Sequence, residues 1–424
     1  MRIGLIGLMT CLVAGVATGA VDMRAHAVIK SDRSDGRYVS TRGVVQDLLR
    51  TTKEALAFDA TMPDGEFAKW RSEVRTKLRE LLAFPSLPAA PAPKLLGQEK
   101  RAGYALEKWE HYPMPNVAVP YLALVPDGVS AEHPAPAVLC LPGTSMTKES
   151  SAGEPELNSA SAIYKDYVRE NRMALEYCRA GFVAIAVDNP GVGETADMER
   201  VVGGRHRHIG EIAAFGHFLF NLGWSYMGYA AYVDHRLLEV MRGDPRVDRA
   251  RIAVSGHSLG GWLAAFLAAL NEDVAAAVVN QQVYRWHEAV RTMTRPNVAG
   301  DRPPILGHGV FYFIPGLYRY MDMPDICAAI APRPLLLSEG TPERERQEVF
   351  LPAWKKAGAP DRLEIVPFEK YKDPASRPAT APPEGLGSIT ELYGHYANDY
   401  PKHYFKGETA VPWLKKTLGL FRDL

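Results

Sequence analysis

The segment Arg251–Gly261, with the sequence RIAVSGHSLGG, limits the possible folds of this chain more than any other feature. Its first half is a short apolar run typical of a buried strand, and the small and apolar residues 262–270 after it are typical of a helix. A G-x-S-x-G pattern between a strand and a helix predicts a nucleophile elbow, a sharp turn that presents Ser258 at the helix N-terminus. Gly256 and Gly260 leave room for the strand and the helix to approach closely. The alternative is a glycine-rich turn with an inert serine.

The composition excludes some classes of partner. The 49 lysines and arginines balance the 49 aspartates and glutamates, so no net charge attracts a polyanion and we expect no nucleic-acid partner. Beyond the N-terminal region the chain has Cys140, Cys178 and Cys327, which are widely spaced and form neither a disulfide framework nor a zinc pattern. At 424 residues the chain can bury a large core.

The N-terminus has the pattern of a secretory signal. Arg2 supplies a positive charge, residues 3–20 are apolar and uncharged, and small residues near positions 20 and 27 offer cleavage sites. We predict that residues 1–27 are a signal peptide and that the mature protein is exported, to a periplasm or the extracellular medium, without stable membrane insertion. The alternative is an uncleaved membrane anchor, because the apolar run has about the minimum length for a span.

The remaining chain divides at a proline-rich stretch, residues 85–93. Helices are expected before it, over 41–58 and 66–84, so residues 28–95 are predicted to form an N-terminal helical extension with a linker. From residue 96 to 424 strands and helices alternate, which predicts an α/β fold with a mainly parallel, doubly wound sheet and helices on both faces. Strands are expected at 102–110 and 117–125 (an antiparallel pair), 137–141, 182–187, 252–255, 274–279, 334–338 and 363–366, and helices at 160–180, 226–241 and 409–420.

A serine nucleophile needs a histidine as base and a carboxylate to orient that histidine. In a chain with this elbow the order is serine, acid, histidine. His403 lies directly before the closing helix and is the predicted base, and His395 in the same loop is its rival. For the acid, the strand ending at Ser338 leads into a turn that contains Glu343, and Glu339 and Glu345 are alternatives.

The oxyanion formed during acyl transfer needs two backbone N–H donors. Leu259 follows the nucleophile and supplies one of them. The loop after the strand 137–141 contains Gly143, which allows the backbone to turn its amides toward the site. Thr144 or Ser145 in that loop is expected to supply the second donor.

Four segments together resemble the acetyl xylan esterase-like and dienelactone hydrolase-like branch of the α/β-hydrolases. They are Leu141–Glu149 with Ala152–Pro155, Asp248–Gly261, Ile330–Gly340, and Pro401–Phe405 through Trp413. The resemblance covers most of the chain after residue 95 and implies an α/β-hydrolase catalytic domain over 96–424. It implies Ser258 as nucleophile, His403 as base, and an acid in the position of Glu343, where these proteins commonly carry aspartate.

The function implied by this resemblance is hydrolysis of short acyl esters, such as acetyl groups on carbohydrates, by a serine hydrolase without a cofactor. The expected partner is a small-molecule or oligosaccharide ester. A serine peptidase, another acyl hydrolase of the dienelactone hydrolase type, and a non-catalytic carbohydrate-binding protein on the same fold are the alternatives. The sequence does not fix the oligomeric state.

Two further features need interpretation. Residues 281–332 form a long, aromatic-rich insertion before the strand that leads to the acid, and we expect a lid or substrate wall there, or packing against the core. The Arg205–His208 stretch has an H-x-H pair, but no third ligand type lies nearby in the sequence, so we expect a polar loop and no metal site.

Overall fold

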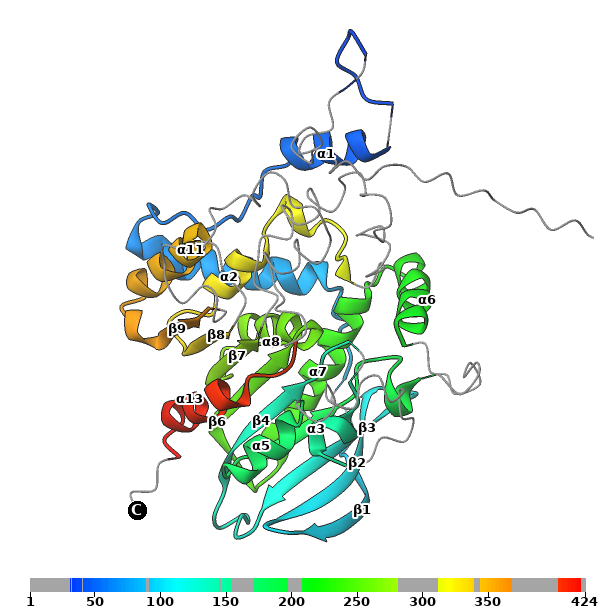
Figure 1. The fold of residues 1–424 in the computed structure, drawn as a ribbon, viewed down its shortest axis with the longest axis vertical. Helices are drawn as coiled ribbons and strands as arrows, with labels where there is room; N and C mark the ends of the chain where they lie inside the picture. Colours follow the sequence, from blue (N-terminus) through cyan, green and yellow to red (C-terminus); the bar gives the residue numbers. More distant parts are fainter. Residues whose placement is uncertain are drawn as a thin grey trace, which may run out of the picture.

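The structure, a computed structural model, describes residues 31, 33–39, 41–88, 91–144, 146–154, 171–196, 208–280, 312–338, 344–367 and 403–420. Within these residues the chain forms a twisted sheet with helices around it (Figure 1). The helices are α1 (Thr41–Thr51), α2 (Asp64–Leu81), α3 (Lys148–Ala152), α5 (Met173–Arg179), α6 (His208–Asn221), α7 (Tyr226–Gly243), α8 (Leu259–Leu270), α10 (Met323–Ala328), α11 (Arg344–Lys356) and α13 (Gly407–Thr417).

The sheet has nine strands in the described part of the chain, in the order β1-β2-β3-β5-β4-β6-β7-β8-β9. The first three pair antiparallel, β3 pairs antiparallel with β5, and the strands from β5 to β9 pair parallel. This is the predicted mainly parallel α/β sheet. The strands are β1 (Lys94–Arg101), β2 (Tyr104–Met114), β3 (Val117–Pro126), β4 (Ala135–Leu141), β5 (Val183–Val187), β6 (Val247–His257), β7 (Ala276–Asn280), β8 (Leu335–Ser338) and β9 (Leu363–Val366).

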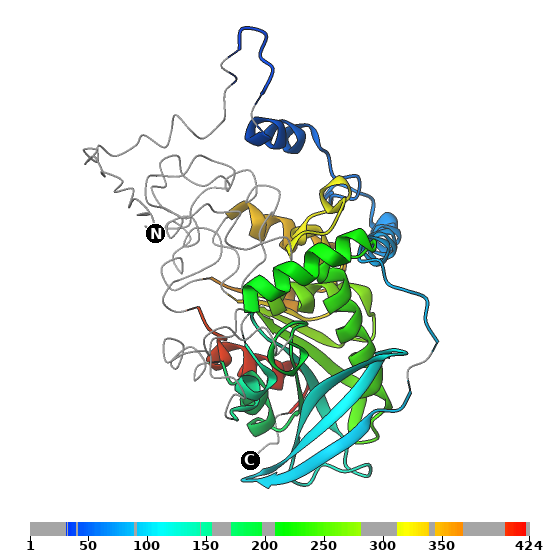
Figure 2. The same ribbon diagram turned by 90° about the vertical axis from the view of Figure 1, so that its right-hand side faces the viewer.

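Apolar side chains alternate between the two faces of the central strands, because successive residues of a strand point to opposite sides. In β4, Leu139 and Leu141 join a core with α2, α7, α8 and α10, whereas Val138 and Cys140 join a core with α5 and α13. Figure 2 shows α13 and α5 on one side of the strands and α7 and α8 on the other. The sheet is therefore covered on both faces, as predicted.

The N-terminal helix α2 packs on the main fold through an apolar face formed by Phe67, Trp70, Val74 and Leu78, all of them buried. The first helix, α1, is shorter than the predicted 41–58. After it the backbone N–H groups of residues 55 and 56 donate to the carbonyls of Arg319 and Tyr320. These two N–H groups are therefore not available for the hydrogen bonds that would extend α1.

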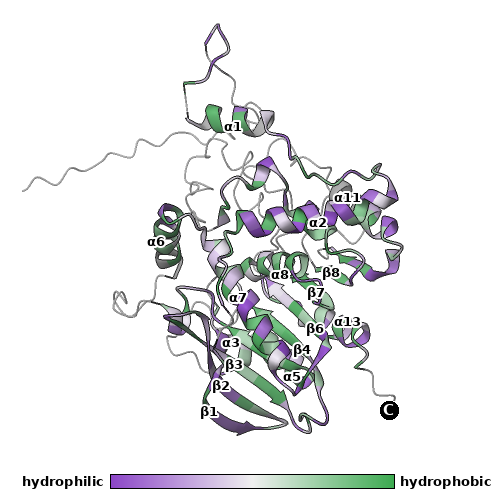
Figure 3. Ribbon diagram, turned by 180° about the vertical axis from the view of Figure 1, so that it is seen from behind, coloured by the Kyte–Doolittle hydropathy of each residue, from purple (hydrophilic) through white to green (hydrophobic). Residues whose placement is uncertain are grey.

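Some elements differ from the sequence prediction. Strand β1 was not predicted, because it is polar and exposed along nearly its whole length, as an edge strand can be (Figure 3). Helix α5 covers only the end of the predicted helix 160–180, whose residues up to 170 lie outside the described part. The helices α3, α6, α10 and α11 were not predicted either. The signal peptide prediction also concerns residues outside the description, and no described helix is long and apolar enough to cross a membrane.

The carboxyl ends of the parallel strands all lie at the same edge of the sheet. The register pairs Leu141 with Gly256, His257 with Asn280, and Asn280 with Ser338. The loops that follow β4, β6, β7 and β8 therefore begin side by side, and open α/β sheets bind ligands at this edge.

Candidate active site

Ser258 occupies a strained turn between β6 and α8. Its backbone angles are φ 55° and ψ −118°, a region that residues other than glycine rarely adopt. Such a conformation costs about 1–3 kcal/mol and persists only where the surroundings enforce it. A Cβ on Gly256 would collide with the carbonyl of Gly260, and a Cβ on Gly260 would collide with the carbonyl of Leu141. Both glycines of the motif are therefore required by the close approach of strand and helix.

His403 meets the serine at this turn. Its Nε2 lies 3.1 Å from Ser258 Oγ, and both side chains are buried. The ring of His257 packs against that of His403, with 4.7 Å between ring centres. Burial lowers the pKa of His257 well below its usual range, and His403 and Lys406 lower it further. His257 is therefore neutral and adds no positive charge beside the base.

Two buried asparagines fix the segment that carries His403. The side chain of Asn171 accepts the Phe405 N–H at 2.8 Å, and that of Asn280 accepts the Lys406 N–H at 2.9 Å. The carbonyl of Asn280 also accepts the Ser258 N–H at 3.0 Å. Sequence analysis missed Asn280, although an amide at the carboxyl end of a central parallel strand was a usable signal.

Leu259 is the first residue of α8 and carries one of the N–H groups that an α-helix leaves without an intrahelical acceptor. The carbonyl of Ser258 accepts the Gly261 N–H at 2.9 Å, which fixes the peptide plane of Leu259. On the neighbouring loop, Thr144 Oγ1 lies 3.4 Å from the hydroxyl of Tyr312. Tyr312 comes from the long insertion and packs against Trp262 of α8.

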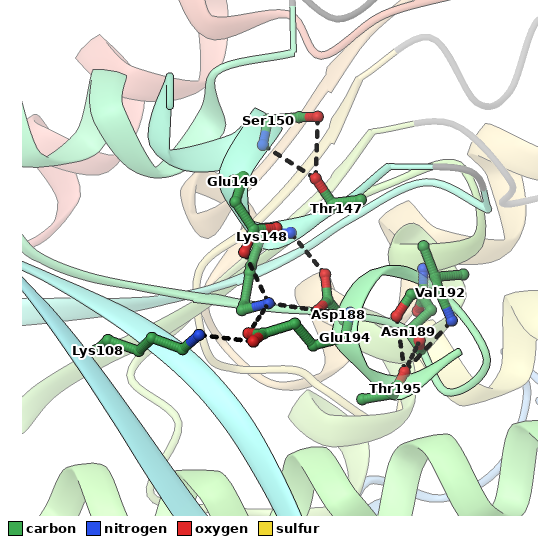
Figure 4. A network of polar contacts seen from close by, with 10 residues as sticks. All are labelled: Lys108, Thr147, Lys148, Glu149, Ser150, Asp188, Asn189, Val192, Glu194 and Thr195. Carbon is green, nitrogen blue, oxygen red and sulfur yellow. Dashed lines mark hydrogen bonds and ion pairs between the residues drawn. The ribbon is translucent and has the colours of Figure 1, made fainter. Parts of the chain in front are cut away.

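A buried ionic network follows that loop (Figure 4). The ammonium of Lys148, which is fully buried, forms ion pairs with Asp188 at 2.8 Å, Glu149 at 2.8 Å and Glu194 at 2.7 Å. Glu194 also pairs with Lys108 at 2.6 Å. The Lys148 ammonium thus has three carboxylates, one for each of its protons.

Burial dominates the electrostatics of this network. It raises the pKa of the Asp188 carboxyl to about 6, although the charge of Lys148 opposes that shift. Burial alone would lower the pKa of Lys148, but Asp188 and Glu149 outweigh it and hold the pKa above its usual range. The network therefore keeps a permanently charged lysine beside a carboxylate that takes up a proton in mildly acidic solution.

Several predicted site residues lie outside the described part. Glu343 and its alternative Glu339, together with His395 and Ser145, belong to this group, as does the side chain of Glu345 in α11. Among the candidates that the structure does describe, it brings together Ser258, His403 and Leu259. The described residues contain no cluster of three or more histidine, cysteine, aspartate or glutamate side chains suited to a metal ion.

The chain matches known proteins over most of its length. The model of the Abhydrolase family matches residues 20–416. A Bacteroides fragilis structure named "putative acetyl xylan esterase" is 37% identical, covers 93% of this chain and 99% of that chain, and superposes with a TM-score of 0.84. The Bacillus subtilis protein "Putative hydrolase YtaP" is 26% identical over 214 residues, which are 50% of this chain and 62% of that relative's length. The chain therefore belongs to the α/β-hydrolase family, in its acetyl xylan esterase-like branch.

Proposed function

We propose that this α/β-hydrolase is a serine esterase that cleaves short-chain carboxylic esters through an acyl-enzyme. The observation that carries the proposal is the 3.1 Å approach of His403 Nε2 to Ser258 Oγ, on a serine held in strained backbone geometry at a helix N-terminus. A hydroxyl within hydrogen-bond reach of an imidazole is the arrangement that activates serine as a nucleophile.

In the acylation half, Ser258 Oγ attacks the ester carbonyl carbon while His403 Nε2 takes the hydroxyl proton. The carbonyl oxygen becomes an oxyanion, and the N–H groups of Leu259 and Thr144 donate to it. The bond to the alcohol oxygen then breaks, and His403 returns the proton to the leaving alcohol. The acyl group is left on Ser258.

In the deacylation half, water repeats the sequence with His403 as base, which releases the carboxylic acid and restores the serine. Glu343 is proposed to orient His403 through Nδ1 and to stabilise the imidazolium. The position of β8 supports this role, because its last residue Ser338 pairs with Asn280 at the edge where Ser258 lies. Glu343 follows Ser338 by five residues in the chain, so its segment leaves the sheet at that edge.

For the substrate class we propose acetyl groups on carbohydrates. The support is the 37% identical Bacteroides fragilis protein, which is named "putative acetyl xylan esterase" and aligns over 99% of its length. Tyr312 of the insertion 281–332 contacts Thr144, so the insertion is proposed to form a wall of the substrate site. We further propose that residues 1–27 direct export, that 28–95 form a helical extension, and that 96–424 form the catalytic domain.

The test is hydrolysis of p-nitrophenyl acetate, butyrate and octanoate by wild type and Ser258→Ala. We expect acetate to be the best substrate and kcat to fall about 10⁶-fold in the variant, as for other serine nucleophiles. Ser225→Ala is the matched control, because Ser225 is equally buried but caps α7 by accepting the Gly228 N–H at 3.0 Å. Equal turnover by wild type and Ser258→Ala would refute the proposal, and release of acetate from acetylated xylan fragments then tests the substrate.

A further inference from the structure

We propose that Asp188 and Asn189, consecutive residues after β5, form a clamp on the loop 142–148, and that Asn189 is the positioning residue for the oxyanion donor on Thr144. The proposal deepens the esterase function and depends on it. No motif in the sequence marks these two residues, and neither touches the reacting groups.

The clamp follows from the order of strands. Since β4 and β5 are parallel neighbours, with Cys140 opposite Ala186, the segments that follow them leave the sheet side by side. Asn189 Nδ2 donates to the carbonyls of Pro142 at 3.1 Å and Gly143 at 3.0 Å. These contacts hold the beginning of the loop.

Asp188 holds the end of the same loop. Its Oδ1 accepts the backbone N–H of Lys148 at 2.7 Å, and its Oδ2 accepts the Lys148 ammonium at 2.8 Å. Two adjacent side chains therefore grip residues 142–143 and 148. Thr144, which lies between these two points, is therefore held from both sides.

The grip on Gly143 also sets the direction of an N–H group. In a trans peptide the carbonyl of one residue and the N–H of the next lie in one plane and point in opposite directions. Because Asn189 Nδ2 and the Met146 N–H both donate to the Gly143 carbonyl, that plane cannot rotate without losing two hydrogen bonds. The N–H of Thr144 belongs to the same plane, so its direction is fixed as well.

Asn189 is itself held rigidly. Its side chain is buried, with 2% of its surface exposed. The backbone carbonyl of Asn189 accepts hydrogen bonds from the Thr195 hydroxyl at 2.9 Å and from the Val192 N–H at 3.0 Å. These bonds hold Asn189 in the turn that ends at η3 (Gly193–Thr195). Figure 4 shows Asn189 between this turn and the network around Lys148. A donor fixed before the reaction needs no reorganisation when the oxyanion forms, which is the source of its effect on the rate.

The test measures kcat, KM and inhibition by a methyl trifluoromethyl ketone in Asn189→Ala and in the milder Thr195→Val. Ser258 Oγ adds to the carbonyl carbon of the ketone, and the ketone oxygen becomes an oxyanion in the proposed site. The affinity for the ketone therefore measures how well the two N–H donors stabilise that oxyanion. Removing one oxyanion donor costs about 10²–10³-fold in kcat, and a donor that is only misaligned should cost less. We expect Asn189→Ala to lose about 10- to 100-fold in kcat and the same factor in ketone affinity, with KM nearly unchanged. Thr195→Val should change both in the same direction by about fivefold, the equivalent of one hydrogen bond.

Asn271→Ala is the matched control. Asn271 is also buried and its amide donates to a backbone carbonyl, that of Leu267 at 2.8 Å, but it lies at the far end of α8. It should lose stability and keep the wild-type kcat and ketone affinity. If Asn189→Ala and Thr195→Val lose stability but keep wild-type kcat and ketone affinity, the clamp is only structural and the proposal is wrong. Failure of the esterase function is a separate result, since wild type itself would then show no turnover that depends on Ser258.

Discussion

Replacing Lys148 by methionine isolates the energetic role of the buried network. The substitution keeps an unbranched side chain of similar shape, shorter by the terminal atom, but removes the ammonium that faces Asp188, Glu149 and Glu194. Asp188 is 2% exposed, so water cannot replace the lost partner without opening the loop. The variant therefore leaves carboxylates in a buried site, and among the described residues Lys108, which pairs with Glu194, is the remaining lysine of this network.

Breaking a buried ion pair by removing one partner destabilises a fold by about 3–5 kcal/mol, because an uncompensated charge remains. We expect Lys148→Met to lower the free energy of unfolding at pH 8 by that amount. The matched control is Lys69→Met, because Lys69 pairs with Glu73 at 3.6 Å on the exposed face of α2. Exposed pairs of this kind contribute about 0.5 kcal/mol or less.

The loss should also depend on pH. The folded-state pKa of Asp188, about 6, lies above the ordinary value of about 4 for an unfolded chain, so its protonated form favours the fold. That contribution is present below about pH 4 and is lost as the pH rises through 6. Without Lys148 the pKa rises further, since the ammonium charge lowers it. The variant should therefore lose less stability at pH 5 than at pH 8.

Urea unfolding followed by tryptophan fluorescence at pH 5 and pH 8 measures both effects. A loss below about 1 kcal/mol at pH 8, or the same loss at both pH values, would show that Lys148 does not neutralise buried carboxylates.

Three other predictions concern separate parts of the molecule. Gly260→Ala should lower the thermal midpoint of unfolding strongly, because the new Cβ collides with the backbone of Leu141. Gly243→Ala is the control and should be neutral or slightly stabilising, because open space surrounds that position. An unchanged thermal midpoint in Gly260→Ala would contradict the close approach of strand and helix. Burial raises the pKa of the Asp234 carboxyl well above its usual range, so this group destabilises the fold as the pH rises above about 4. Asp234→Asn should raise the free energy of unfolding at pH 8 and change it less at pH 4, and a loss at pH 8 would refute this. Glu343→Gln should reduce kcat about 10²–10⁴-fold, while Glu339→Gln should keep it within a few fold; the reverse order would move the acid to Glu339.

The sequence predicted the central part of the fold because its signals are local. Strands β4, β5, β7 and β8 are short apolar runs, and the longer β6 has such a run in its second half. The elbow at Ser258 has two glycines that steric contacts require. Strand β1 escaped prediction because it is polar and owes its conformation to pairing with β2. The end of α1 depends on hydrogen bonds to residues 319–320, which lie far away in the sequence.

The site was predictable where residue type and chain order determine chemistry. Ser258 and His403 follow from the motif and from the position before the last helix, and the structure brings them within hydrogen-bond reach. Asn189 and Asn280 are harder to recognise, because an amide at the end of β7 is a weaker signal than a motif and no motif marks Asn189. The Asn280 amide accepts the N–H of Lys406, 126 residues later in the chain, and the Asn189 amide donates to the carbonyl of Gly143, 46 residues earlier. The folded chain brings these groups together.

The central claim is that Ser258 is the nucleophile of an ester hydrolase. It is tested most directly by reacting the protein with diisopropyl fluorophosphate and following phosphorylation by peptide mass spectrometry alongside p-nitrophenyl acetate turnover. The account predicts one phosphoryl group on Ser258, loss of turnover in proportion to labelling, and no labelling of His403→Ala on the same time scale. Turnover that survives complete labelling of Ser258, or inactivation with the label on another residue, would contradict it.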